Sequence, residues 1–415
     1  MEIIQISYYL EGMFMEYIQR SIVIRIAVVA LIMLISMQIG SAGDFSIEEW
    51  NSTFGELYDS EIGYSVQQTS DGGYIIAGET NQNAWLIKTD SKSKEQWNMQ
   101  FERGKAVFVK QASDGGYYLI GETTQDGGPW IGECKDGLCW DIWLNIDEIW
   151  LVKTDAKGKE QWNKTIRTKY SSYDAGFNVQ HTRDGGYILA TTITSYGHNY
   201  TINNAWLIKI DSEGNEQWSK SFGGAWNIIY SVQQTSDGGY IFAGRGSDDA
   251  WLVKTDAKGN ELWNKTFGGI NKDRANFVQI DHDGSYVIGG STILYGANNS
   301  DGWFIKVDTS GNEQWNRTFG GPDNDHIMAA RQTLDEGYIL VGRSNYQNAV
   351  WIIKTNSDGD KQWNKSFSGK NMSYYLNSIQ PTIDGGYILT GLGTKSPYIY
   401  QYVNQCDGKC YCDLV

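Results

Sequence analysis

A polar side chain recurs at one position in seven similar segments of the chain, four residues before an aspartate. The position just before it is apolar in every segment. Because successive side chains of a strand point to opposite sides, one column packs inside while the other can face an open channel. Amide and cationic side chains there could bind a polar or anionic ligand, or simply solvate a water-filled pore, and we keep both interpretations. The seven residues of this channel ring are Gln67, Lys110, Gln180, Gln233, Gln279, Arg331 and Gln380.

Aromatic residues gather in segments of variable length between the repeated ones. The largest such segment, Gln125 to Glu148, is an insertion with three Trp and two Cys. Binding sites concentrate on variable loops carried by a rigid scaffold. Exposed Trp and Tyr offer large, stiff contact areas to sugar rings and protein surfaces. We therefore predict ligand contacts at Trp130, Trp140, Trp143, Tyr196, Tyr200, Trp226, Tyr295 and Tyr346.

Familiar catalytic motifs do not occur in the sequence. The four His lie in unrelated contexts, and there is no Gly-X-Ser-X-Gly, His-Glu-X-X-His or phosphate-binding glycine loop. A recurring turn that contains Asp256 lacks the alternating oxygen ligands of a calcium loop, so we expect a plain hairpin turn. We predict no catalytic residue, metal or cofactor. Paired carboxylates on separate loops keep a polysaccharide hydrolase or lyase as the alternative.

The elements that carry these residues come from a repeat. Asp-Gly-Gly-Tyr or a near variant occurs seven times, and each of the first six copies is followed by two Trp that lie twelve residues apart. In the fourth copy, 231–235 alternates in character, 236–239 is a tight turn, 240–244 is an apolar strand and 251–267 is a second hairpin. Such a unit buries its apolar faces only by stacking on its neighbours. The copies begin at Asp71, Asp114, Asp184, Asp237, Asp283, Asp335 and Asp384.

This repeat predicts an all-β fold, a seven-bladed β-propeller with four-stranded blades. The seventh copy lacks the second Trp, whereas Glu48 to Gly55 near the N-terminus reads like the outer strand of the other units. We therefore expect an N-terminal strand around Trp50 to complete the last blade and close the ring. The predicted regions are an N-terminal extension plus signal peptide (1–42), the propeller (43–403) and a Cys-containing tail (404–415).

Composition and the N-terminal segment bear on location and partners. The net charge of −15 argues against nucleic acid and anionic lipid as partners. Arg20 and Arg25 precede the apolar run 26–35, and small residues follow at 40–42, as in a secretory signal. We expect a secreted, cell-surface-associated monomer whose partner is an envelope polysaccharide or a surface protein. An uncleaved signal anchor is the alternative and would be its one membrane contact.

Cysteines and sequons fit an extracellular chain. Close Cys pairs outside the cell form disulfides, which predicts a bridge between Cys134 and Cys139. Of the three C-terminal cysteines, Cys406, Cys410 and Cys412, one is left over or pairs between molecules, and a zinc site is the rival interpretation. Asn-X-Ser/Thr directly after the second Trp suggests glycosylation of the outer strand, although the pattern can also be repeat consensus alone. The candidates are Asn51, Asn163, Asn264, Asn316 and Asn364.

The segment from Asp237 to Trp263 contains Asp-Gly-Gly-Tyr-Ile-Phe-Ala-Gly and then Trp-Leu-Val-Lys-Thr-Asp-Ala-Lys-Gly-Asn-Glu-Leu-Trp. This segment resembles the repeats of secreted β-propeller-like proteins of methanogenic archaea and some bacteria. The resemblance covers Glu48 to Val403 and implies an extracytoplasmic propeller without naming an activity. The turn from Asp256 to Trp263 is also similar to the tryptophan-docking turn of quinoprotein dehydrogenases. Its shorter Asp-to-Gly spacing, and seven units where those enzymes have eight, argue against pyrroloquinoline quinone.

The residues together predict a non-catalytic propeller that recognises a carbohydrate or a protein through the face that carries its variable loops. A structural component of the cell envelope is a further alternative.

Overall fold

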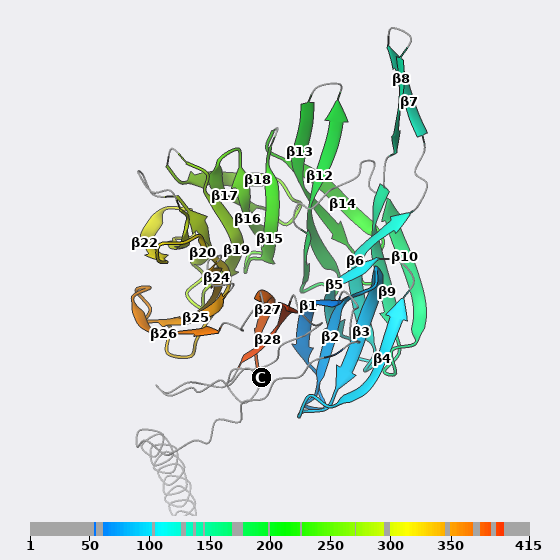
Figure 1. The fold of residues 1–415 in the computed structure, drawn as a ribbon, viewed down its shortest axis with the longest axis horizontal. Coiled ribbons are helices and arrows are strands. Elements are labelled where there is room, and N and C mark those ends of the chain that lie inside the picture. The colour runs from blue at the N-terminus through cyan, green and yellow to red at the C-terminus, as the bar shows by residue number, and fades with distance from the viewer. Residues whose placement is uncertain are drawn as a thin grey trace, which may run out of the picture. The chain divides into compact units, whose positions relative to one another are not determined.

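Six antiparallel four-stranded sheets stand side by side as the blades of a β-propeller in the computed structural model (Figure 1). The structure describes Phe54 and residues 61–101, 104–125, 130–135, 138–143, 146–167, 177–197, 200–224, 226–269, 271–293, 299–344, 349–367, 374–382 and 387–393. All of them lie in one unit that spans Glu49–Val415. None of the described residues belongs to a helix long and apolar enough to cross a membrane.

The first three blades run outward from the axis in the same strand sequence, with one extra hairpin inserted in the second blade. The first blade contains β1 (Glu61–Gln68), β2 (Tyr74–Thr80), β3 (Asn83–Thr89) and β4 (Glu95–Phe101). The second contains β5 (Lys105–Gln111), β6 (Tyr117–Gln125), β9 (Ile146–Thr154) and β10 (Glu160–Arg167). The third contains β11 (Phe177–His181), β12 (Tyr187–Gly197), β13 (Tyr200–Ile210) and β14 (Glu216–Phe222).

The next three blades repeat this order without an insertion. The fourth contains β15 (Ile228–Gln234), β16 (Tyr240–Gly246), β17 (Asp249–Thr255) and β18 (Glu261–Phe267). The fifth contains β19 (Arg274–Ile280), β20 (Tyr286–Thr292), β21 (Asp301–Val307) and β22 (Glu313–Phe319). The sixth contains β23 (Asp325–Gln332), β24 (Tyr338–Ser344), β25 (Ala349–Thr355) and β26 (Lys361–Phe367).

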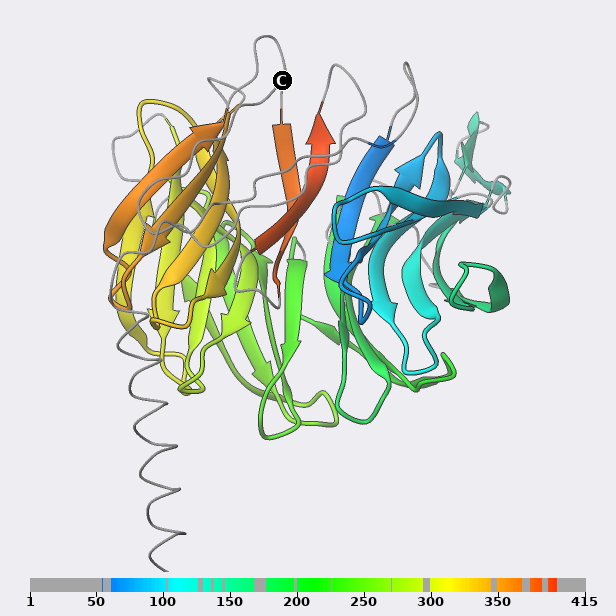
Figure 2. The same ribbon diagram turned by 90° about the horizontal axis from the view of Figure 1, so that it is seen from below.

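The predicted number of blades is wrong: the described residues form six four-stranded blades, not seven. The seventh motif copy contributes a two-stranded sheet, β27 (Tyr374–Pro381) with β28 (Tyr387–Gly393). This hairpin contacts β23 on one side and β1 on the other, and Figure 2 shows it in orange-red between the orange and blue blades. The prediction failed because the Asp-Gly-Gly-Tyr motif marks only a first hairpin, whereas a four-stranded blade also needs the Trp-pair hairpin.

The expected closing strand around Trp50 lies outside the described residues. Phe54, four residues later, is described and buried. It packs with Val66 and Trp85 of the first blade and with Ile388 of β28.

Tryptophan and tyrosine from consecutive blades form the main packing contact between them. The second Trp of one blade lies over the glycine in the outer turn of the next; Trp218, for example, lies so close to Gly259 that a Cβ there would be 2.7 Å from its ring. The same Trp218 meets Tyr240, the motif tyrosine of the next blade, edge to face at 5.7 Å between ring centroids. A large ring therefore requires a glycine and a tyrosine one blade further on, which explains why the three recur together.

A buried lysine connects the two hairpins within each blade. In the fourth blade Lys254 of β17 lies 2.8 Å from Asp237 in the motif turn, and it also donates to the carbonyl of Thr255 at 2.9 Å. The backbone approaches so closely that a Cβ at Gly239 would lie 2.1 Å from the Thr255 oxygen. The ion pair repeats in all six blades, as Lys88–Asp71, Lys153–Asp114, Lys209–Asp184, Lys254–Asp237, Lys306–Asp283 and Lys354–Asp335.

The fifth blade shows how this arrangement adapts to a changed sequence. Its motif reads Asp-Gly-Ser-Tyr, and the Ser285 hydroxyl donates a hydrogen bond to Asp283. In the fourth blade the motif aspartate, Asp237, accepts the corresponding hydrogen bond from the Thr235 hydroxyl. Lys306 here also pairs with a buried second carboxylate, Asp281, at 3.0 Å.

Candidate functional site: an axial cavity

The innermost strands of the six blades and of the β27–β28 hairpin enclose a cavity of about 890 Å³. It is lined along β5 from Lys105, the first residue of that strand, to Lys110 near its end. The first residues of these strands follow the blade-to-blade loops, so the cavity reaches the variable-loop face. This volume lies within the range of roughly 300–1,000 Å³ that small-molecule sites occupy.

A β-bulge in the inner strand turns an extra side chain toward this cavity. The register of β1, β5, β15, β19 and β23 with their partners shifts at one residue each, and that residue lines the cavity in all five. A bulge re-aims a side chain and is common beside functional sites. The bulged residues are Tyr64, Val107, Tyr230, Asn276 and Met328.

Six of the seven predicted channel-ring residues line the cavity, and Gln279 does not. The side-chain oxygen of Gln67 accepts a hydrogen bond from the backbone N–H of Gln111 in the next blade, at 2.8 Å. Gln233 accepts from Ile280 in the same way at 2.9 Å, and Gln180 accepts from Gln234. With its amide oxygen and nitrogen exchanged, Gln279 makes the equivalent bond to the backbone of β23.

These glutamines therefore join neighbouring inner strands whose N–H groups would otherwise lack a partner. Lys110 and Arg331 carry no acceptor atom and cannot make this bond. Lys110 has no hydrogen bond or ion pair within the part of the chain that the structure describes, and burial lowers its pKa. Arg331 donates to the carbonyl of Ala330 at 2.9 Å, and burial lowers its pKa as well.

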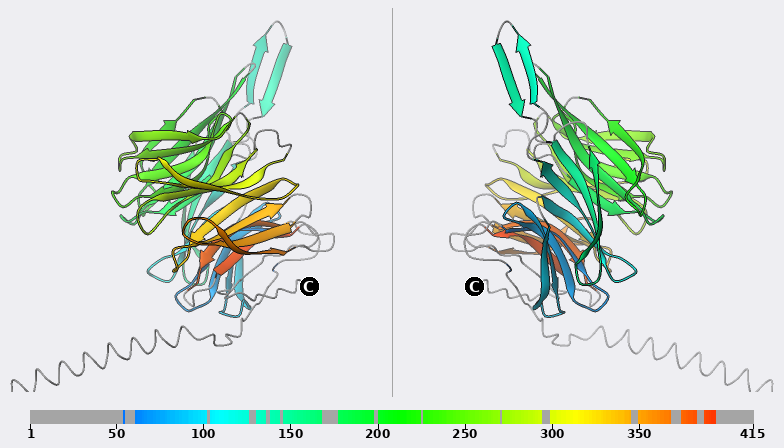
Figure 3. Two further views of the ribbon diagram at one scale, coloured as in Figure 1. Left: turned by 90° about the vertical axis from the view of Figure 1, so that its left-hand side faces the viewer. Right: turned by 90° about the vertical axis from the view of Figure 1, so that its right-hand side faces the viewer.

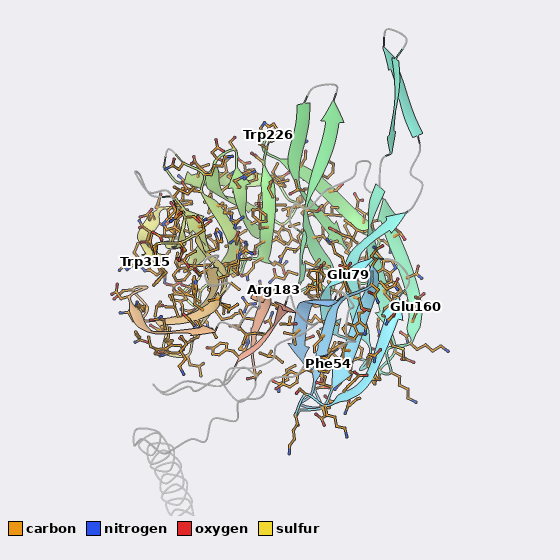
Figure 4. All side chains as sticks on the ribbon, in the orientation of Figure 1. Phe54, Glu79, Glu160, Arg183, Trp226 and Trp315 are labelled. Carbon is orange, nitrogen blue, oxygen red and sulfur yellow. The ribbon has the colours of Figure 1, made fainter. Side chains whose placement is uncertain are left out.

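The cavity is cationic although the protein is strongly acidic. Its lining contains five Lys or Arg and a single carboxylate, an excess of four positive charges. That carboxylate, Glu122, is already paired with Lys105 at 3.0 Å. Glu79 of the first blade (labelled in Figure 4) accepts a hydrogen bond from Tyr64.

Arg274 and Arg343 line the variable-loop end of the cavity, and the charge of Arg245, from the fourth blade, also acts on Arg274. Arg274 begins β19, while Arg245 and Arg343 lie near the ends of β16 and β24. Burial lowers the pKa of Arg274, and the charges of Arg343 and Arg245 lower it further. His326, directly opposite Arg343 in the sheet, has its pKa lowered to about 4 by burial and by Arg274 and Arg343. The imidazole is therefore neutral at neutral pH.

These three arginines were not among the predicted site residues, although the sequence contained a signal. Arg245 and Arg343 occupy the same repeat position, which follows the apolar residues of the second strand. The first two blades have Glu79 and Glu122 at this position. Aligning that position across the repeats would have shown a change from acid to base around the ring.

The predicted aromatic contacts are only partly within the described residues. Tyr295 and Tyr346 lie outside them. Trp226 is 51% exposed and adopts a positive φ of 77°, a conformation that large side chains rarely take (labelled in Figure 4). Tyr196 and Tyr200 lie at the facing ends of β12 and β13, although their side chains are not described.

The insertion in the second blade forms a hairpin of β7 (Trp130–Lys135) and β8 (Leu138–Trp143), drawn away from the blades in Figure 3. Its backbone register puts Trp130 opposite Trp143 and Cys134 opposite Cys139, with Trp140 also in β8. Directly opposite residues in an antiparallel pair have the Cα separation that a disulfide needs. The side chains of this hairpin are not described, so the disulfide stays a prediction.

Four of the five glycosylation candidates are exposed on the outermost strands, and Asn51 lies outside the described residues. Asn163 donates from its side-chain amide to Glu160, three residues earlier, because a bulge between them puts both side chains on one side. Asn264 and Asn316 make the same bond to Glu261 and Glu313, while Asn364 has Lys361 at that position.

Two pairs of aspartates, Asp249 with Asp273 and Asp301 with Asp325, lie at or beside the starts of strands at the variable face, in equivalent places of neighbouring blades. Burial raises the pKa of Asp249, with a contribution from Asp273, and burial together with Asp325 raises the pKa of Asp301. The Asp273 carboxylate accepts from the backbone of Gly269 at 2.9 Å. Their repetition and these bonds assign both pairs a structural role at this face. No cluster of three or more possible metal ligands occurs among the described residues.

Comparison with known proteins supports the fold class. Residues 203–395 match the family described as outer membrane protein assembly factor BamB, which is a distant similarity over less than half of the chain. No curated protein matches the chain.

Several solved structures align with most of the chain. A polysaccharide lyase, Uly1, aligns with a TM-score of 0.49 and 11% identity, over 88% of this chain and 94% of that one. Semaphorin 1b domains 1–2 from Drosophila align with a TM-score of 0.49 and 6% identity, over 85% and 86%. A glucose dehydrogenase gives 0.45 and 11%, over 86% and 100%. Likenesses this distant bear on neither ligand nor reaction.

Proposed function

We propose that this β-propeller is a secreted or cell-surface recognition module without catalytic activity. It binds a carbohydrate or protein ligand at the variable-loop face, over the mouth of the axial cavity. The observation that carries the proposal is the cavity itself, about 890 Å³ in volume and lined by bulged side chains from five inner strands. A propeller that only scaffolded its neighbours would not need side chains redirected to its axis.

Trp226 supports the same face. It lies in the connection between the third and fourth blades, where its exposure and its positive φ both work against stability. A large apolar side chain held in such a conformation at the surface is a frequent property of contact residues.

The test is retention of the full chain on immobilised envelope polysaccharides and surface proteins of the host cell. Two variants separate the possible contact sites. Gln125 and Ile146 are direct partners in the sheet, so an Asn-Gly turn can replace residues 126–145 without disturbing β6 and β9. The second variant is Trp226→Ala.

We expect the full chain to be retained, and at least one variant to lose retention while keeping its thermal midpoint. Equal retention of both variants would remove the variable-loop face as the site. Depolymerisation of a retained polysaccharide would contradict the non-catalytic assignment.

A further inference from the structure

The glutamines of the channel ring follow one hydrogen-bonding rule around the axis. Each accepts from the backbone N–H of the residue that comes just after the ring position in the next inner strand. The pairs are Gln67 with Gln111, Gln180 with Gln234, Gln233 with Ile280 and, with its amide exchanged, Gln279 with Gln332. Because the amide oxygen is engaged, the other polar group of each side chain is an NH2 donor. In Gln67, Gln180 and Gln233, which line the cavity, this NH2 has no hydrogen-bond partner among the described residues.

Lys110 and Arg331 depart from this rule, because neither side chain has an acceptor atom. By the same register the residue opposite Arg331 is Pro381, which has no N–H to satisfy. The residue opposite Lys110 is His181, from whose N–H a glutamine at position 110 would accept. The lysine gives up that hydrogen bond and places an ammonium group in the cavity instead. Position 110 is therefore occupied in a way that interstrand bonding does not explain.

Neither of these two cations has a counter-charge among the described residues. Lys110 makes no hydrogen bond or ion pair with them, and Arg331 donates only to the carbonyl of the residue before it. Burial lowers the pKa of both side chains, and no carboxylate acts against it. The single carboxylate of the cavity lining, Glu122, is paired with Lys105 at the other end of the cavity. Burying a cation without a partner is unfavourable, so a ligand of opposite charge is indicated.

The two cations approach the axis from opposite sides. The inner strands follow one another around the channel in the order β1, β5, β11, β15, β19, β23 and β27, and β27 contacts β1 again. Between Lys110 of β5 and Arg331 of β23 there are thus two inner strands on one side and three on the other. Burial and the charge of Lys110 lower the pKa of His181 in β11, which is therefore neutral at neutral pH. A group at the axis would meet two positive charges, with amide donors between them.

Asp384 is the acidic residue outside the described ranges that lies nearest in sequence to this ring, four residues after Gln380. It is the motif aspartate of the seventh copy. In each of the six blades the corresponding aspartate pairs with a lysine of its own second hairpin. A counter-ion from this position is the alternative to a ligand, and the experiment below includes it.

We propose that Lys110 and Arg331 bind a divalent tetrahedral oxyanion, a sulfate or phosphate group, at the motif-turn end of the axial cavity. The amides of Gln67, Gln180 and Gln233 are its further donors. A ring that offers donors from several directions and no acceptor suits an ion with oxygens on all sides, and two positive charges match its two negative ones. Arg331 uses one N–H for its neighbouring carbonyl and has its other donors for the ligand. This site lies at the end of the cavity away from the variable-loop face, so the inference goes beyond the proposed function.

The experiment measures binding of inorganic sulfate and phosphate to the full chain by calorimetry, in a buffer without other multivalent anions. Lys110→Gln and Arg331→Gln install the residue that the ring has at its other five positions, so they keep the ring polar. Arg183→Gln is the matched control: it removes the same charge from an exposed turn at the same end, outside the cavity lining. Asp384→Asn tests the alternative counter-ion. Glucose 6-sulfate, with glucose as its neutral counterpart, separates a sulfated saccharide from the free ion.

We expect one sulfate or phosphate ion to bind per chain, and Lys110→Gln and Arg331→Gln each to weaken this binding about tenfold or more. Arg183→Gln should leave the affinity unchanged. Without sulfate, the thermal midpoint of Lys110→Gln should exceed that of wild type, because glutamine removes a buried charge and accepts from the N–H of His181. Added sulfate should raise the midpoint of wild type more than that of either ring variant.

The absence of sulfate and phosphate binding to wild type would overturn the inference, as would wild-type affinity in both Lys110→Gln and Arg331→Gln. Binding that appears only in Asp384→Asn would show that this carboxylate already neutralises the cations, and it would overturn the inference too. Tighter binding of glucose 6-sulfate than of sulfate would support the site with a sulfated saccharide as its ligand, and equal or weaker binding would support it with the free ion. Retention on envelope material tests the proposed function and does not depend on this site.

Discussion

Breaking the buried ion pair of a blade should have very different effects depending on which partner is removed. In the fourth blade the Lys254 side chain is 6% exposed, whereas the Asp237 side chain is 58% exposed. Asp237→Asn leaves the turn intact, since its remaining oxygen can still accept from Gly239 and Thr235, but it strips a buried ammonium of its counter-ion. Removing one partner of a buried pair costs about 3 kcal/mol of the free energy of unfolding.

Lys254→Met removes the other partner and should cost much less. The methionine fills nearly the same buried volume, and the carboxylate left behind faces water. The lost attraction is then that of a screened pair, about 1 kcal/mol or less. The double variant no longer buries a charge, so it should be more stable than Asp237→Asn alone.

Urea unfolding followed by tryptophan fluorescence measures these free energies in wild type, both single variants and the double variant. The expected order of stability is wild type, Lys254→Met, the double variant and Asp237→Asn. If Lys254→Met were the most destabilised, or if the double variant were less stable than Asp237→Asn, the reasoning from unequal burial would be refuted.

Three other predictions concern turns, pH and the variable face. Glu336 takes the place of a motif glycine and has a φ of 63°, so Glu336→Gly should raise the free energy of unfolding by about 1 kcal/mol in the same urea assay. Gly238 has a φ of 83° at an uncrowded position, so Gly238→Ala should lower the free energy of unfolding by a similar amount. Partial burial would raise the pKa of Asp237, but hydrogen bonds from Lys254 and neighbouring groups outweigh it and lower the pKa to about 2, below the ordinary 3.8. Its contribution to stability is therefore present above about pH 4 and lost as the pH falls toward 2, so the thermal midpoint should drop in that window, and less steeply in Lys254→Met. Trp226→Gly should raise the thermal midpoint because it relieves the positive φ, while lowering retention on envelope material; a lower midpoint would show that Trp226 has a structural role.

Local structure was predictable from the repeat because it depends on near neighbours in sequence. The motif turn, the apolar second strand and the constant second hairpin were all predicted, and they form as β16 to β18 in the fourth blade. The placement of the channel ring followed from strand alternation alone, and six of its members line the cavity. The blade count failed because the motif marks only the first hairpin of a unit.

Contacts that join distant segments were harder to predict. The pairing of Lys254 with Asp237 was missed, although both belong to the repeat consensus, because strand alternation does not reveal that a lysine is buried. The bulges that aim Tyr230 and Asn276 at the axis depend on register, which periodicity does not report. The arginine cluster arises only when three blades converge, so it required the ring geometry as well as the sequence.

The most direct test of the account is the retention of the full chain, beside Trp226→Ala and the replacement of residues 126–145, on immobilised envelope polysaccharides and surface proteins of the host cell. The account predicts that the full chain is retained and that at least one of the two variants is not. No retention of the full chain, or equal retention of all three proteins, would contradict it.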